Sequence, residues 1–125
     1  MEFQVTYLEK EKIIVSRLSE YYDWTVAEKM VPALSVLIKE KSCKHILLNF
    51  ATANMKLSTI NIYMTPDKLA TEFLKYGVDI RQLRRAMVVA KDENDYRFLA
   101  NVTVNQSQLL RIFHDEDSAI NWLME

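Results

Sequence analysis

The sequence predicts one α/β domain, residues 1–125, with a mostly parallel (mixed) five-stranded sheet. Short apolar runs of strand type alternate along the chain with segments in which apolar residues recur every three or four positions. Strands that alternate with helices favour a parallel sheet covered by about four helices, with an antiparallel N-terminal edge strand. A chain of 125 residues, half of them apolar, is also long enough to bury a core.

The first predicted element is a β-hairpin. Residues 3–8 alternate between apolar and polar side chains, and the apolar run over 13–18 follows after a short gap. The charged tetrad over 9–12 lacks a typical Asn-Gly or Asp-Gly turn signal. The hairpin is therefore predicted from the two strand patterns and the short connection between them.

Apolar spacings of three and four predict a helix from about Asp23 to Lys41, with Asp23 as its N-cap. Pro32 lies inside it, and an interior proline costs roughly 3 kcal/mol and usually kinks a helix. We expect one kinked helix because the apolar stripe continues through Pro32. The next strand is predicted over His45 to Phe50, and a polar loop over 51–57 follows.

The pattern over Ser58 to Met64 leaves two alternatives open. Apolar residues alternate there as in a strand, whereas Ser58 suits a helix cap. The following helix is predicted to begin with Thr65 as cap and Pro66 at its first position, and to end just before Gly77.

The C-terminal third begins with a connector over Val78 to Arg85 and continues with two further predicted strands and two helices. The strands are expected over Ala86 to Ala90 and Gln108 to Phe113. The helices are expected to begin at Asp92 and after the N-cap Asp115.

Composition narrows the possible functions. A net charge of −1 and a pI near 6.1 give no basic field for nucleic acid or an anionic membrane. The single cysteine, Cys43, excludes an internal disulfide, and no segment resembles a signal peptide or a spanning helix. We therefore expect a cytoplasmic protein without nucleic-acid binding or stable membrane association.

The order of elements, the N-terminal hairpin and the closing LLRIFHDEDSAINWL resemble the STAS superfamily, in particular its small stand-alone SpoIIAA-like proteins. In the anti-sigma factor antagonists of that superfamily, an aspartate ends the central strand and a phosphorylatable serine opens the next helix in an Asp-Ser-Ser-Gly context. Asn49 falls at the strand position, and Ser58 and Thr59 fall at the hydroxyl positions. Leu57 and Ile60 replace the flanking aspartate and glycine.

The resemblance implies a non-catalytic regulatory domain that binds a protein partner or a second copy of itself. Asn49, Ser58 and Thr59 would form its switch or partner-binding site. The alternative function is binding of a small apolar ligand or lipid, in a pocket lined by apolar residues over 60–64 and by Phe73. An enzyme ranks last, because the sequence offers no nucleophile with its base, no metal triad and no glycine-rich phosphate loop.

Three further features, namely an arginine cluster, two acidic clusters and the single cysteine, each allow either a functional or a purely structural interpretation. Arg81, Arg84 and Arg85 form the only local basic patch and would bind an anion or an acidic partner, or else solvate a connector. The acidic clusters 92–95 and 115–117 suit the first turns of helices better than a cation site. Cys43 suits a buried turn better than a reactive thiol. We accordingly predict no metal and no cofactor.

Overall fold

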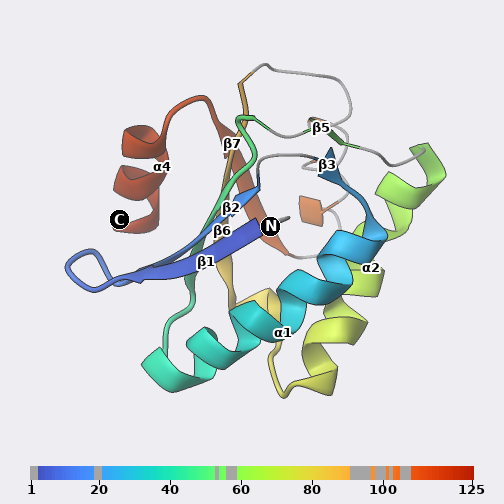
Figure 1. Cartoon of the computed structure of the whole chain (residues 1–125), viewed down its shortest axis with the longest axis horizontal. Helices are drawn as coiled ribbons and strands as arrows, with labels where there is room; N and C mark the ends of the chain where they lie inside the picture. Colours follow the sequence, from blue (N-terminus) through green and yellow to red (C-terminus); the bar gives the residue numbers. More distant parts are fainter. Residues whose placement is uncertain are drawn as a thin grey trace.

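The structure is a computed structural model whose central feature is a mixed five-stranded sheet in the order β1-β2-β4-β6-β7 (Figure 1). It describes residues 3–18, 21–52, 54–55, 59–90, 97, 101, 103–104 and 108–125, with the backbone alone at 21, 54–55 and 59–63. The strands are β1 (Phe3–Leu8), β2 (Ile13–Leu18), β4 (His45–Asn49), β6 (Arg84–Val88) and β7 (Leu109–Phe113). β1 is antiparallel to β2 and the other neighbours are parallel, which confirms the predicted fold class and edge strand.

Helices cover both faces of this sheet (Figure 1). The helical segments are α1 (Trp24–Lys41), α2 (Thr59–Lys75), the short 3₁₀ helix η1 (Ile80–Gln82) and α4 (Glu116–Leu123). α1 and α2 pack on one face, and α4 packs on the other. A second sheet, which the sequence did not predict, pairs β3 (Tyr21–Tyr22) with β5 (Asn54–Met55) in parallel.

Alternation along the inner strands divides the core into two clusters. On β4, Ile46 and Leu48 belong to the cluster under α1 and α2, whereas Leu47 belongs to the cluster under α4. All three side chains are buried because both faces of a parallel sheet are covered by helices. If the register of such a strand shifted by one residue, the side chains that now face α1 and α2 would face α4, and those that face α4 would face α1 and α2.

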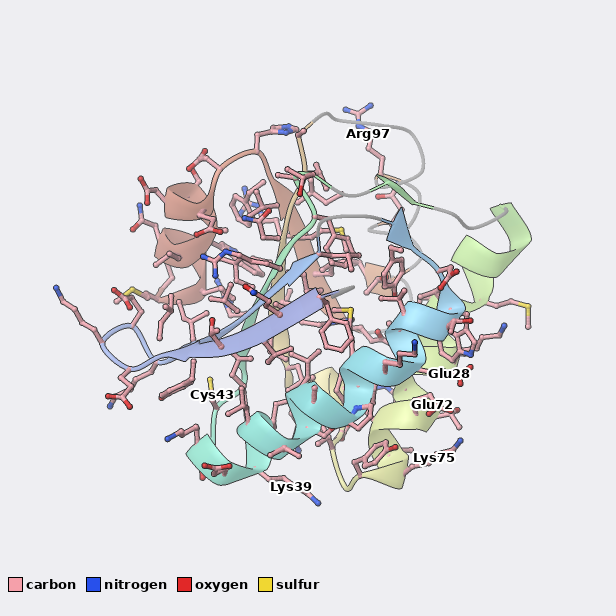
Figure 2. All side chains as sticks on the ribbon, viewed as in Figure 1. Glu28, Lys39, Cys43, Glu72, Lys75 and Arg97 are labelled. Atoms are coloured by element: carbon pink, nitrogen blue, oxygen red, sulfur yellow. The ribbon has the colours of Figure 1, made fainter. Side chains whose placement is uncertain are left out.

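Helix α1 matches its prediction at both ends. Asp23 is the N-cap, and its Oδ1 accepts a hydrogen bond from the amide of Val26 at 3.0 Å. Pro32 lies inside the helix, which continues past it to Lys41. Ser42 then adopts a left-handed conformation, and Cys43 follows as a buried residue at the turn into β4 (Figure 2). Its thiol donates to the Lys12 carbonyl oxygen at 3.2 Å, so the structural interpretation of Cys43 is confirmed.

The predicted start of the next helix was wrong. α2 begins at Thr59 rather than after Thr65, so Pro66 lies inside the helix. Of the two alternatives left open for Ser58 to Met64, the helical one is correct for residues 59–64. A proline removes one backbone hydrogen bond, and a helix tolerates this where tertiary contacts hold the segment. Here Thr65 and Pro66 are buried, and the Pro66 carbonyl oxygen accepts a hydrogen bond from Gln108 at 2.9 Å.

The predicted end of α2 was correct. Gly77 has φ of 77°, in the left-handed region that favours glycine. Its amide donates to the Leu74 carbonyl oxygen, and the amide of Val78 donates to that of Phe73, each at 3.0 Å. These two hydrogen bonds form a Schellman motif, which satisfies the last carbonyls of the helix.

The C-terminal predictions need one correction. β6 runs from Arg84 to Val88, not from Ala86 to Ala90, so two arginines assigned to a connector are strand residues. β7 begins one residue after Gln108, and Asp115 caps α4 as predicted. The predicted start of a helix at Asp92 falls on residues 91–96, which lie outside the described part of the chain.

Candidate functional site

Asn49 ends β4 and joins three elements at the C-terminal edge of the sheet. Its Oδ1 accepts a hydrogen bond from the amide of Ala51 at 3.0 Å, which fixes the turn out of the strand. Its Nδ2 donates to Oε2 of Glu116, the first residue of α4. Oε1 of Glu116 in turn accepts from Arg17 of β2 at 3.2 Å. The Asn49 carboxamide is therefore held in one orientation.

A surface hollow of about 520 Å³ lies beside this network. We call it the Asn49 groove; its lining residues are Phe3, Gln4, Arg17, Leu18, Asn49, Ala51 and Thr52. The Arg17 side chain is 46% exposed, and Thr52 is also exposed. The groove thus offers a partner a cation and a hydroxyl beside an aromatic ring.

The other two residues of the predicted switch lie on the chain that leaves this groove. Ser58 lies outside the described residues. Thr59 is the first residue of α2, and only its backbone is described. Of the three predicted residues, the structure therefore places the side chain of Asn49 alone.

The three arginines of the predicted basic patch do not share a surface. Arg81 is exposed in η1. Arg84 and Arg85 are consecutive on β6, so their side chains point to opposite faces of the sheet. The guanidinium of Arg84 lies 3.9 Å from the ring centroid of Trp122 in α4, and its Nη2 donates to the Trp122 carbonyl oxygen at 2.8 Å. Arg85 enters the core under α1 and α2, where it is 5% exposed.

Arg85 lines a small cavity of about 40 Å³ between the sheet and helices α1 and α2. We call it the Arg85 cavity. Among the described lining residues, Arg85, Tyr22, Thr65 and Thr103 are polar and the others are apolar. Nη2 of Arg85 donates to Oε1 of Gln108 at 2.8 Å, and Gln108 is buried.

Burial shifts the pKa of both titratable groups in the Arg85 cavity. It lowers the pKa of the Arg85 guanidinium to about 10 and raises the pKa of the Tyr22 hydroxyl to about 12. At neutral pH Arg85 is therefore charged and Tyr22 is neutral.

Sequence reasoning missed this cavity because it began β6 two residues too late and assigned Arg85 to a connector. With the strand begun at Arg84, the period of two places Arg85 on the same face as Met87, which also lines the cavity. No comparable signal identifies Tyr22 or Thr103.

The apolar pocket expected from residues 60–64 and Phe73 is only partly described. Phe73 lines the Arg85 cavity, whereas Met64 is 45% exposed. The side chains of Ile60, Ile62 and Tyr63 lie outside the described part of the structure.

Of the two acidic clusters, the structure describes the one over residues 115–117. Asp115 accepts from the amide of Ser118 at 2.7 Å, while residues 92–95 lie outside the described chain. Within the described residues, no group of three or more His, Cys, Asp or Glu side chains is placed to hold a metal ion.

In the same part of the chain, no helix combines the length and apolar character needed to cross a membrane.

Comparison with known proteins identifies the fold. No protein-family model matches the sequence, and no curated protein matches it. Among solved structures, the anti-sigma factor antagonist SpoIIAA in its unphosphorylated form aligns with a TM-score of 0.57 at 18% identity, covering 97% of this chain and 96% of that one. An uncharacterized DUF3478-family protein with a SpoIIAA-like fold from Shewanella loihica aligns with a TM-score of 0.57 at 16% identity, covering 97% and 91%. The chain has a SpoIIAA-like fold, as its sequence predicted.

Proposed function

We propose that this chain is a non-catalytic regulatory domain that binds a protein partner in the Asn49 groove. The observation that carries the proposal is the groove itself, which lies at the carboxyl end of a central parallel strand, where α/β proteins usually place their ligands. The likeness of fold to an anti-sigma factor antagonist, a regulatory protein, supports the same class of function.

The electrostatics of the groove favour an acidic segment of the partner. Arg17 is paired with Glu116 at 3.2 Å, but its side chain remains about half exposed. Exposed ion pairs contribute only about 0–1 kcal/mol, so a carboxylate of the partner can replace Glu116 at low cost. Phe3 adds an aromatic contact of the kind enriched in protein interfaces.

A phosphorylation switch on Ser58 or Thr59 fits this mode of binding. Both residues lie on the connection that begins with Ala51 and Thr52 of the groove and ends in α2. A phosphate would add nearly two negative charges to that connection and repel an acidic partner. Ser58→Asp should weaken binding while leaving the fold intact, and Ser58→Ala should retain binding.

The test uses the tagged full chain in its source cells. A partner recovered with the wild type, identified by mass spectrometry and purified, is titrated against the variants by calorimetry. Arg17→Glu should weaken binding by at least about tenfold, because like charges in an interface are strongly unfavourable. Lys12→Glu, an equal reversal of charge in the hairpin turn at the other end of β2, should have little effect.

Two results would contradict the proposal. One is a partner that binds Arg17→Glu and the wild type equally well. The other is a chain that recovers no specific partner and forms a dimer of itself by light scattering, which would assign the surface to a second copy.

A further inference from the structure

The Arg85 cavity contains a buried cation that no opposite charge matches among the described residues. Arg85 is 5% exposed, and its Nε has no hydrogen-bond partner among the described residues. The partner of its Nη2 is Gln108, a neutral side chain. A buried charge is strongly unfavourable unless an opposite charge pairs with it.

The described wall of the cavity supplies no anion. Its only other titratable group is Tyr22, whose hydroxyl stays protonated at neutral pH because burial raises its pKa to about 12. Arg85 stays protonated as well, since its lowered pKa of about 10 is still above neutrality. The described wall of the cavity therefore carries one net positive charge and can accept one negative charge.

Volume and lining restrict the anion. The cavity of about 40 Å³ has room for roughly three water-sized groups, at about 10–15 Å³ each. Most of its wall is apolar, including Met30, Leu34 and Phe73. A fitting ligand has three or four heavy atoms, one negative charge and an apolar end.

We propose that the Arg85 cavity binds a small monocarboxylate of the size of acetate. The carboxylate accepts hydrogen bonds from Nε and a second N–H of the Arg85 guanidinium, the paired geometry that carboxylates and guanidinium groups favour. The methyl group contacts the apolar wall. This site is separate from the Asn49 groove, so it stands independently of the proposed partner binding.

Thermal unfolding of the full chain tests the proposal. Sodium acetate replaces sodium chloride at constant pH and sodium concentration, and acetamide serves as the neutral analogue. The unfolding midpoint should rise by about 5 °C for each tenfold increase in acetate above its Kd. No rise with acetate, or an equal rise with acetamide, would overturn the proposal.

Two variants and one control locate the site. Arg85→Gln should abolish the acetate response, and Ala27→Leu should do the same by filling the cavity while retaining Arg85. Arg84→Gln removes the same charge on the opposite face of β6 and should retain the full response. An acetate response that persists in Arg85→Gln or Ala27→Leu would overturn the assignment.

A direct measurement covers the case in which these variants do not fold. With wild-type protein, nuclear Overhauser contacts should connect the acetate methyl protons with the side chains of Met30 and Leu34. Saturating acetate without any such contact would also overturn the proposal.

Discussion

Arg84 and Arg85 are neighbours on one strand, yet they occupy opposite environments. Arg84 stacks on Trp122 and remains partly exposed on the α4 face. Arg85 is buried on the α1 and α2 face beside a cavity. On a strand covered on both sides, the parity of a position decides which of the two helix-covered faces its side chain enters. Adjacent charges in such a strand do not form a surface patch.

The largest expected effect is on the Arg84 face. Trp122 is 8% exposed, packs on Phe113 with ring centroids 5.7 Å apart and lies under Arg84. Trp122→Ala should lower the free energy of unfolding by about 3–5 kcal/mol, because it leaves a cavity in the α4 core. Urea unfolding measures this loss. Trp24→Ala, at a partly buried tryptophan on the other face, should lower the free energy of unfolding by less. An equal loss in the two variants would contradict the larger contribution assigned to Trp122.

The second effect concerns the partner of Arg85. Gln108 accepts from Arg85 and donates to the Pro66 carbonyl oxygen. Gln108→Ala should cost about 2–3 kcal/mol in urea unfolding, because it leaves a buried charged donor and a carbonyl without their partner. Gln82→Ala, at an exposed glutamine in η1, is the matched control and should change stability by less than about 0.5 kcal/mol.

A double variant tests whether the buried charge of Arg85 stabilises or destabilises the fold. Arg85→Met combined with Gln108→Leu should recover most of the stability lost in Gln108→Ala, because apolar replacements remove the need to pair a buried charge. A double variant less stable than Gln108→Ala would show that the Arg85 charge itself stabilises the fold.

A smaller effect is expected at Arg84. Arg84→Gln removes the cation–π contact with Trp122 and the hydrogen bond to its carbonyl oxygen, and should cost about 1–2 kcal/mol. Arg81→Gln removes an exposed arginine in η1 and should be nearly neutral. Equal losses in the two variants, measured by urea unfolding, would mean that the contacts of Arg84 with Trp122 contribute nothing to stability.

The smallest effect is a pH dependence at the start of α4. Hydrogen bonds from the amide and hydroxyl of Ser118 lower the pKa of Asp115 below its ordinary value. This cap therefore stabilises the fold above the ordinary pKa, and the stabilisation is lost as pH falls through the folded-state pKa. Asp115→Asn keeps a capping oxygen and should flatten the acid side of the stability profile. Asp117→Asn, in the same turn, is the control; identical profiles for the two variants would refute this role.

Local chemistry made part of the fold predictable from sequence. Asp23, Gly77 and Asp115 each satisfy backbone groups at a helix end, and each boundary they predicted was correct. The closing segment and the order of elements were sufficient to predict the SpoIIAA-like fold.

Boundaries that depend on distant partners were not predictable. Arginine is rare in a buried strand, and β6 accommodates two because Gln108, 23 residues from Arg85, and Trp122, 38 residues from Arg84, supply their contacts. The Pro66 carbonyl oxygen likewise receives its hydrogen bond from the distant Gln108. The Arg85 cavity was not predictable for the same reason, because its wall is formed by residues from separate elements of the chain.

Arg84 and Arg85 are expected to differ in their response to acetate. The most direct test is an acetate titration in which ¹⁵N nuclear magnetic resonance follows the Nε–H signal of each arginine. We expect the Arg85 signal to move in a saturable manner while the Arg84 signal stays in place, because only Arg85 faces the cavity. An Arg85 signal that does not respond to acetate, or two signals that move together, would contradict the account.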